Sequence, residues 1–114
     1  MPRFVILEHD HPRLHWDFML ESGDVLRTWR LEEPPQPGKL VAAEASFDHR
    51  HLYLEYEGPV SGERGSVTRW DGGTFTWETD TPARVAVRLN GKRLGGRAVL
   101  ERTASGDWSF TYVV

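Results

Sequence analysis

The stretch LHWDFMLESGDVLRTWRL, residues 14 to 31, alternates apolar and polar side chains on both sides of a short polar interruption. On the apolar face of its first half lie Leu14, Trp16, Phe18 and Leu20. A period of two residues is the pattern of a half-buried β-strand. The interruption, Ser-Gly-Asp at residues 22–24, consists of turn formers. The stretch therefore predicts two antiparallel strands joined by a tight turn.

The same alternation recurs in five further segments, which are residues 3–9, 51–57, 67–78, 85–102 and 108–114. Two of these segments contain internal turn signals, Asp71-Gly72-Gly73 and Asn90-Gly91, and each signal predicts a hairpin. A second Ser-Gly-Asp turn at residues 105–107 would lead into the last strand. Residues 32–39 are rich in proline and predict a surface loop, whereas residues 40–47 are compatible with a turn of helix.

About eight short strands and no long helical segment predict a mainly β protein with little helix. We expect a small, compact antiparallel β-barrel, closed or nearly closed, because closure removes exposed strand edges. A two-sheet sandwich is the alternative. No repeat or linker divides the chain, so residues 1–114 are expected to form a single domain.

Composition narrows the classes of partner and the location. Hydrophobic residues make up 39% of the chain and charged residues 27%, which are ordinary values for a globular protein. The absence of cysteine excludes disulfides and cysteine-ligated metals. No apolar run predicts a membrane span or a signal peptide, so we expect a cytoplasmic protein. The net charge of −3 gives no global support for a nucleic-acid partner.

Residues 8–21 contain three histidines and two aspartates, which makes this stretch a candidate metal or catalytic site. Strand alternation places His15 and Asp17 side by side on the polar face, and the short connection before them would bring His9 near Asp17. A second cluster supplies His49, His51 and Tyr53. Imidazoles and a carboxylate suit a divalent transition metal such as manganese or zinc, which polarises phosphoryl oxygens. The alternative is that these histidines are surface residues that cap the ends of strands and that the Asp17 side chain hydrogen-bonds to a turn.

These residues resemble the signature of the 3′-phosphoesterase domain of bacterial ligase D, the multifunctional ligase of non-homologous end joining. The pattern is carried by Phe4, Val5, His9, Leu14, His15, Asp17, Leu20 and Glu21. It continues through Trp29, Asp48-His49, Tyr53, Glu57-Gly58, Trp70-Asp71 and residues 87–103. The similarity covers nearly the whole chain in order, and it looks like the minimal, stand-alone members of that family.

The resemblance implies a compact β-barrel with its site in a surface crater. It implies that His9, Asp17 and His49 bind a divalent metal, most commonly manganese, and that His15 contacts the scissile phosphate. Tyr53 matches an active-site tyrosine. The family trims a 3′-terminal ribonucleotide from a primer strand and then removes the 3′-phosphate.

Departures from the family pattern bear on activity. An arginine that clamps the phosphate is replaced by Met19, a lysine is replaced by Glu33, and we expect an N-terminal segment of the family to be missing. Strand parity places Met19 on the face of His15 and Asp17, so it should border the crater, and Met19→Arg should raise activity at little cost in stability. The candidate substitute cations are Arg13, Arg30, Arg50 and Arg64.

A basic segment offers a second route to nucleic acid. Its cations are Arg84, Arg88, Lys92, Arg93, Arg97 and Arg102. These cations either contact a phosphate backbone or form a solvated outer face of the barrel. Separately, the five tryptophans are expected mostly in the core.

We therefore expect a monomeric, metal-dependent phosphoesterase acting on 3′ ends of DNA or RNA–DNA primers in end joining, with a separately encoded ligase or polymerase as a partner. The alternative is a catalytically impaired module of the same fold that binds metal and DNA ends. A plain barrel with a protein partner is a third option.

Overall fold

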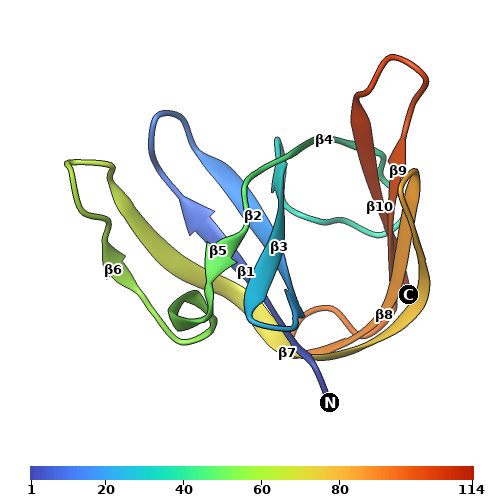
Figure 1. Ribbon diagram of the computed structural model, residues 1–114, viewed down its shortest axis with the longest axis horizontal. Coiled ribbons are helices and arrows are strands. Elements are labelled where there is room, and N and C mark those ends of the chain that lie inside the picture. The colour runs from blue at the N-terminus through green and yellow to red at the C-terminus, as the bar shows by residue number, and fades with distance from the viewer.

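Eight strands form a closed antiparallel barrel, because the sheet that begins at β1 returns to it through β7 (Figure 1). The computed structural model describes residues 1–114. Around the barrel the order is β1 (Arg3–His9), β2 (His15–Ser22), β3 (Val25–Leu31), β4 (Val41–Ala45), β10 (Trp108–Val113), β9 (Arg97–Arg102), β8 (Arg84–Gly91) and β7 (Ser66–Thr81). The short strands β5 (His49–Arg50) and β6 (Gly58–Pro59) lie outside this ring. The predicted barrel is confirmed, and the only helix is the 3-10 turn η1 (His51–Leu54).

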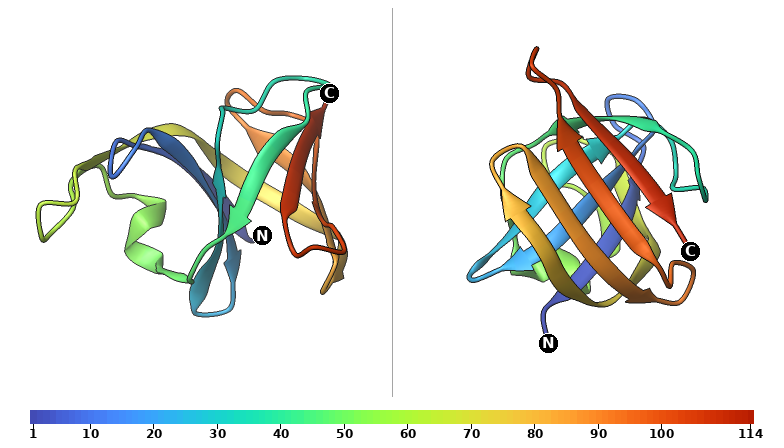
Figure 2. Two further views of the ribbon diagram at one scale, coloured as in Figure 1. Left: turned by 90° about the horizontal axis from the view of Figure 1, so that it is seen from above. Right: turned by 90° about the vertical axis from the view of Figure 1, so that its right-hand side faces the viewer.

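Strand β7 runs without interruption through the sequence that predicted a hairpin at Asp71-Gly72-Gly73. Its first half pairs with β1 and its second half with β8, so one strand connects both sides of the barrel (Figure 2). A Cβ atom on Gly73 would lie 2.1 Å from the carbonyl oxygen of Asn90. The hairpin prediction is wrong because glycine serves here a close approach of two backbones, not a reversal of the chain.

Strands β8 and β9 form the predicted antiparallel hairpin, but its turn does not lie at Asn90-Gly91. Both residues still pair with β7, and the chain reverses only afterwards, where the Gly91 N–H donates to the carbonyl of Leu94. The buried carboxylate of Asp71 accepts the backbone N–H groups of Lys92, Arg93 and Leu94. A carboxylate from β7 therefore selects this longer turn over the local one.

Two other predicted elements are corrected. Residues 40–47 contain strand β4 instead of a helical turn, because this strand fills the space between β3 and β10 and leaves neither edge exposed. Residues 51–57 contain η1 instead of a strand, and Leu54 at its end is buried. By contrast, the turn predicted at residues 22–24 forms at Gly23-Asp24, and the loop at residues 32–39 is confirmed.

The molecule has two hydrophobic clusters, one inside the barrel and one on its outer surface. The larger cluster fills the interior and includes Phe4, Ile6, Phe18, Leu20, Phe75 and Phe110, with Trp29 also buried and the other four tryptophans partly buried against it. The smaller consists of Val5, Leu7, Met19, Leu26, Leu54 and Val67. Residues 46–65, here called the covering segment, hold β5, η1 and β6 and lie against the outer face of β1 to β3 (Figure 1).

The covering segment changes the environment of Met19. Strand parity was right, since Met19 shares the outer face with His15 and Asp17, but its exposure is only 1%. Leu54 and the other members of the outer cluster enclose the thioether. The expectation that Met19 borders the crater is therefore wrong. No helix of the fold has the length and apolar character that a membrane crossing requires.

Candidate active site

The register between β1 and β2 brings three predicted residues together. His9 lies directly opposite His15, and Asp17 follows two residues later on the same face. One ligand atom from each of His9, His15 and Asp17 can be chosen so that all three lie within 4.8 Å of one another. His15 and Asp17 are both 4% exposed, so their polar atoms are largely removed from water.

Hydrogen bonds to backbone carbonyls determine which nitrogen of each imidazole is free. A carbonyl only accepts, so the bonded nitrogen carries the proton. The Nε2–H of His9 donates to the carbonyl of Arg64 at 2.8 Å, and its Nδ1 lies 3.6 Å from a carboxylate oxygen of Asp17. The Nδ1–H of His15 donates to the carbonyl of Arg13 at 2.8 Å, and its Nε2 lies 3.3 Å from the other oxygen of Asp17. Both free nitrogens therefore face the same carboxylate.

The donor set fits a divalent transition metal. When Nδ1 of His15 carries the proton, its buried Nε2 accepts no hydrogen bond, because the Asp17 carboxylate 3.3 Å away cannot donate one, and this is unusual for a polar atom without a further role. Burial lowers the pKa of His15, but the Asp17 carboxylate and the Arg13 carbonyl outweigh it and leave the pKa raised. The pocket thus favours positive charge. Two oriented imidazoles and one carboxylate, each imidazole held by a backbone acceptor, match the usual arrangement of a metal centre.

His49 lies near this trio without being part of it. Its Nδ1–H donates to the carbonyl of Phe47 at 3.0 Å and lies 2.9 Å from the hydroxyl of Thr28. Burial lowers the pKa of His49, and the opposing effect of Asp17 does not restore it. Arg64, whose carbonyl holds His9, also lines a depression beside His49, so this ring borders the same site. The assignment of His9, Asp17 and His49 as metal ligands remains a prediction. In the structure, the histidine whose ring nitrogen lies with the ligand atoms of His9 and Asp17 is His15.

A depression of about 220 Å³ adjoins His49. It is lined by Phe47, Asp48, His49, Arg50, Tyr53 and Arg64. The ring of Tyr53 meets His49 edge-on, with their centroids 5.6 Å apart. The predicted residues His49, Tyr53, Arg50 and Arg64 therefore share one surface, whereas His51 lies elsewhere and bonds the carbonyl of Gly23.

The other two candidate arginines lie beside His15. Arg30 is paired with Asp17 across β2 and β3 and lines a small recess with Arg13 and His15. The Arg13 side chain is 83% exposed and reaches Glu32 at 3.7 Å. Arg30 lies opposite Asp17 in the sheet, and its charge partly offsets the rise in the pKa of His15, so it is the better placed of the two.

Two residues of the site carried no usable sequence signal. Thr28 is buried, and its hydroxyl donates to the carbonyl of Leu26 while facing the ring of His49. Phe47 is 70% exposed, although its side chain is fully apolar. Alternation could place Thr28 on the outer face of β3, but its contact with His49 depends on how the covering segment returns to the barrel.

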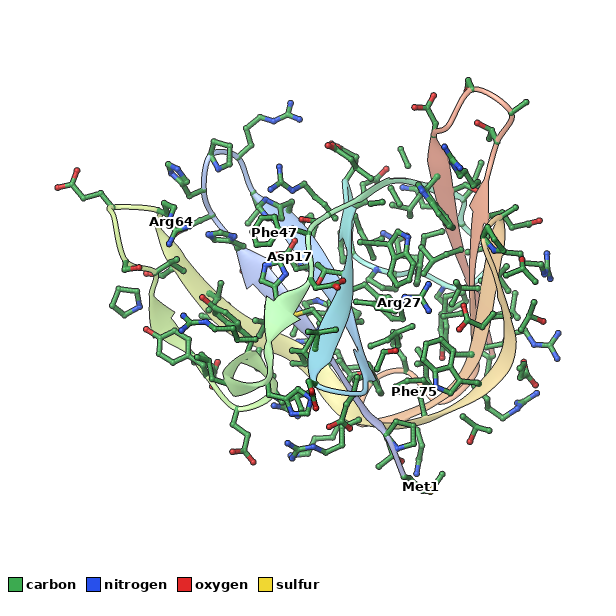
Figure 3. All side chains as sticks on the ribbon, in the orientation of Figure 1. Met1, Asp17, Arg27, Phe47, Arg64 and Phe75 are labelled. Atoms are coloured by element: carbon green, nitrogen blue, oxygen red, sulfur yellow. The ribbon has the colours of Figure 1, made fainter.

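The basic segment lies on the far side of the barrel from this site (Figure 1). Its arginines are largely paired, since Arg84 bonds Glu101 at 2.9 Å and Arg97 bonds Glu78 at 2.7 Å. Arg93 lies over the ring of Trp70. These contacts favour the solvated outer face over a nucleic-acid surface. Figure 3 shows Asp17, Phe47 and Arg64 in the half of the molecule that carries β5 and β6.

Residues 7–102 match the family model described as the DNA Ligase D 3′-phosphoesterase domain. The chain is also similar to the multifunctional non-homologous end joining DNA repair protein LigD of Mycobacterium tuberculosis strain H37Rv, with 39% identity over 114 residues and 92% of this chain covered. Similar proteins of Pseudomonas aeruginosa and Mycolicibacterium smegmatis are 32% and 30% identical and cover 89% and 93% of the chain. The chain spans only 15%, 13% and 16% of the length of these three relatives.

Proposed function

This chain belongs to the DNA ligase D 3′-phosphoesterase domain family, and we propose that it is a metal-dependent phosphoesterase that processes 3′ ends of DNA or RNA–DNA primers. Its reactions would be the removal of 3′-phosphates and 3′-ribonucleotides during DNA end joining. The observation that carries the proposal is the convergence of two free imidazole nitrogens on the Asp17 carboxylate, next to a depression that holds Tyr53 and two arginines. A cytoplasmic, monomeric protein that works with a ligase or polymerase belongs to the same proposal.

We assign the cation to His9, His15 and Asp17. The support is their mutual distance, the two backbone acceptors that hold the histidines and the unpartnered Nε2 of His15. A bound divalent cation, for which manganese is our choice on family resemblance, would supply a Lewis acid that polarises a phosphoryl oxygen. The set predicted from the sequence, with His49 as ligand and His15 at the phosphate, is the competing assignment.

His49 and Tyr53 would then face the phosphate. Because Nδ1 of His49 is held by the Phe47 carbonyl, Nε2 is the nitrogen left to contact a phosphoryl oxygen or the leaving group. Arg50 and Arg64 line the same depression and offer guanidinium groups for the negative charge of the substrate. Arg30 could serve the side that faces His15.

A rival function is supported by the burial of Met19. The thioether of Met19 is enclosed in the outer hydrophobic cluster and cannot donate to an oxygen. This position therefore supplies no positive charge to bind a phosphate. Loss of one transition-state donor costs about 10²–10³ in kcat in a well-studied case. The domain would then bind metal and DNA ends without processing them.

The decisive experiment incubates the protein and manganese with labelled primers that end in a 3′-phosphate, a 3′-ribonucleotide or a 3′-hydroxyl. Conversion of the first two to 3′-hydroxyl ends supports the enzyme. Manganese bound without conversion of any primer would leave only the end-binding module.

The two ligand assignments are separated by His15→Ala and His49→Ala. We expect His15→Ala to lower manganese affinity at least 10-fold to 100-fold, by analogy with loss of metal-site interactions. His49→Ala should keep the affinity near that of the wild type and lose activity. The reverse pattern, measured by calorimetric titration, would establish the competing assignment.

A further inference from the structure

Phe47 is exposed in a way that the fold does not require. Its side chain is 70% exposed, and it is the only aromatic residue among the large hydrophobic side chains that reach the surface. The others are Met1, Leu14, Val25, Leu40, Leu52, Val113 and Val114. Aromatic rings contribute most to stability when buried, so an open phenyl ring at the rim of a site calls for a partner.

The ring is oriented by its neighbour. Phe47 stacks on His49 with ring centroids 4.6 Å apart and an angle of 13° between the planes. One face of the phenyl ring is thus covered by the imidazole, and the high exposure leaves the opposite face to solvent. A planar group that stacked on this open face would add a third ring to the stacked pair of His49 and Phe47.

Cations surround the same position. Arg50 and Arg64 line the depression together with Phe47, and Asp48 adds one carboxylate. Arg64 also supplies the carbonyl that holds His9, so its backbone is anchored to the metal centre. An aromatic platform beside two arginines is the combination that proteins use for single-stranded nucleic acid, in which bases stack and phosphates meet cations.

We propose that Phe47 is the stacking platform for the base of the 3′-terminal nucleotide. With the terminal phosphate at His49, the base of that nucleotide lies over the open face of Phe47, and the next backbone phosphate meets Arg50 or Arg64. Stacking of this kind tolerates any base, because every base presents a π-face. The proposal rests on the proposed function, since it assigns the substrate group that the same site holds.

The test compares two oligonucleotides that differ only at the terminal nucleotide. Both end in a 3′-phosphate, and one carries a tetrahydrofuran abasic residue in place of the last nucleoside. We expect Phe47→Ala to lower kcat/KM about 5-fold to 100-fold more on the base-bearing substrate than on the abasic one. Phe47→Trp should retain the wild-type preference. Leu40→Ala removes a side chain that is 67% exposed and serves as the matched control, without effect on either substrate.

An equal loss on both substrates would overturn the proposal, because Phe47 would then act only by orienting His49. No loss on either substrate would overturn it as well. A second measurement separates this proposal from the function on which it rests. Fluorescence anisotropy gives the affinity of the same variants for 3′-hydroxyl oligonucleotides with and without the terminal base. If no primer is hydrolysed, a loss of affinity confined to the base-bearing oligonucleotide still supports stacking, and equal affinities overturn it.

Discussion

At the scale of single residues, the site depends on which nitrogen of each histidine the backbone occupies. The carbonyls of Arg64, Arg13 and Phe47 each accept a ring N–H, from His9, His15 and His49 respectively. These three bonds leave one nitrogen of every ring available for a ligand. The main chain near the site therefore has a chemical role in addition to its structural one.

Thr28 provides the test of whether His49 needs further support. Thr28→Val keeps the shape of the side chain but removes the hydroxyl 2.9 Å from Nδ1 of His49. We expect kcat to fall about tenfold, which corresponds to about 1.4 kcal/mol of barrier, while KM and manganese affinity stay near wild type. Steady-state kinetics and calorimetry measure these quantities. Thr28→Ser should recover most of the rate, and an equal loss in both variants would show that packing is the cause.

Met19 is a packing residue, so a charge there should unfold the domain. Met19→Arg would place a guanidinium in a cluster where the native side chain is 1% exposed. We expect the free energy of unfolding to fall by about 3 kcal/mol or more, since the buried charge has no partner. Met19→Leu conserves the volume and should cost less than about 1.5 kcal/mol. Urea denaturation measures both values, and a stable, more active Met19→Arg would restore the expectation made from strand parity.

At the scale of elements, glycines and a carboxylate decide how β7 and β8 meet. Gly73 lets the backbone of β7 approach Asn90, and Asp71 holds the turn that follows β8. The turn needs this support because three consecutive N–H groups would otherwise lack a partner in a partly buried position.

Gly73→Ala should therefore destabilise the barrel, whereas Gly95→Ala should not. The new Cβ of Gly73→Ala meets a backbone oxygen at 2.1 Å, and a Cβ on Gly95 meets nothing within 4 Å. We expect Gly73→Ala to lower the free energy of unfolding by about 2 kcal/mol or more and Gly95→Ala to change it by less than about 0.5 kcal/mol. Thermal and urea unfolding test both variants. Equal stabilities would mean that β7 and β8 can move apart freely.

At the scale of the whole molecule, the barrel separates two kinds of surface. The half covered by residues 46–65 carries the cluster of His9, His15 and Asp17 and the depression with Arg50 and Arg64. The other half carries β8 and β9, whose arginines pair with Glu78 and Glu101. A nucleic acid that binds the site would therefore meet only the first set of cations.

Arg64→Ala and Arg97→Ala distinguish the two halves. We expect Arg64→Ala to weaken binding of a 3′-phosphorylated oligonucleotide and to reduce the slope of log affinity against log salt by about one. Arg97 is already bonded to Glu78 at 2.7 Å, so Arg97→Ala should leave both quantities unchanged. Anisotropy titrations at several salt concentrations measure the slope. A larger effect of Arg97→Ala would place the nucleic acid on the basic segment instead.

The alternation of side chains in residues 14–31 was sufficient to predict strands β2 and β3, the turn between them and the shared face of His15 and Asp17. The barrel was predicted only from the number of such strands along the whole chain. The shared face follows because the pleat of a strand fixes the direction of each side chain from its own sequence position. The same local rule explains why Met19 was placed on the correct face.

Only the tertiary structure decided where that face is covered, which glycines turn and which histidine joins the cluster. Met19 is buried because Leu54, far along the chain, packs against it, and the chain does not turn at Gly73 because this residue pairs with β1 on one side and with β8 on the other. The ring of His9 faces Asp17 because its other nitrogen donates to the carbonyl of Arg64, which lies 55 residues along the chain. Each of these outcomes depends on contacts between segments that no local pattern relates, so the pleat determines the strands and long-range packing determines the site.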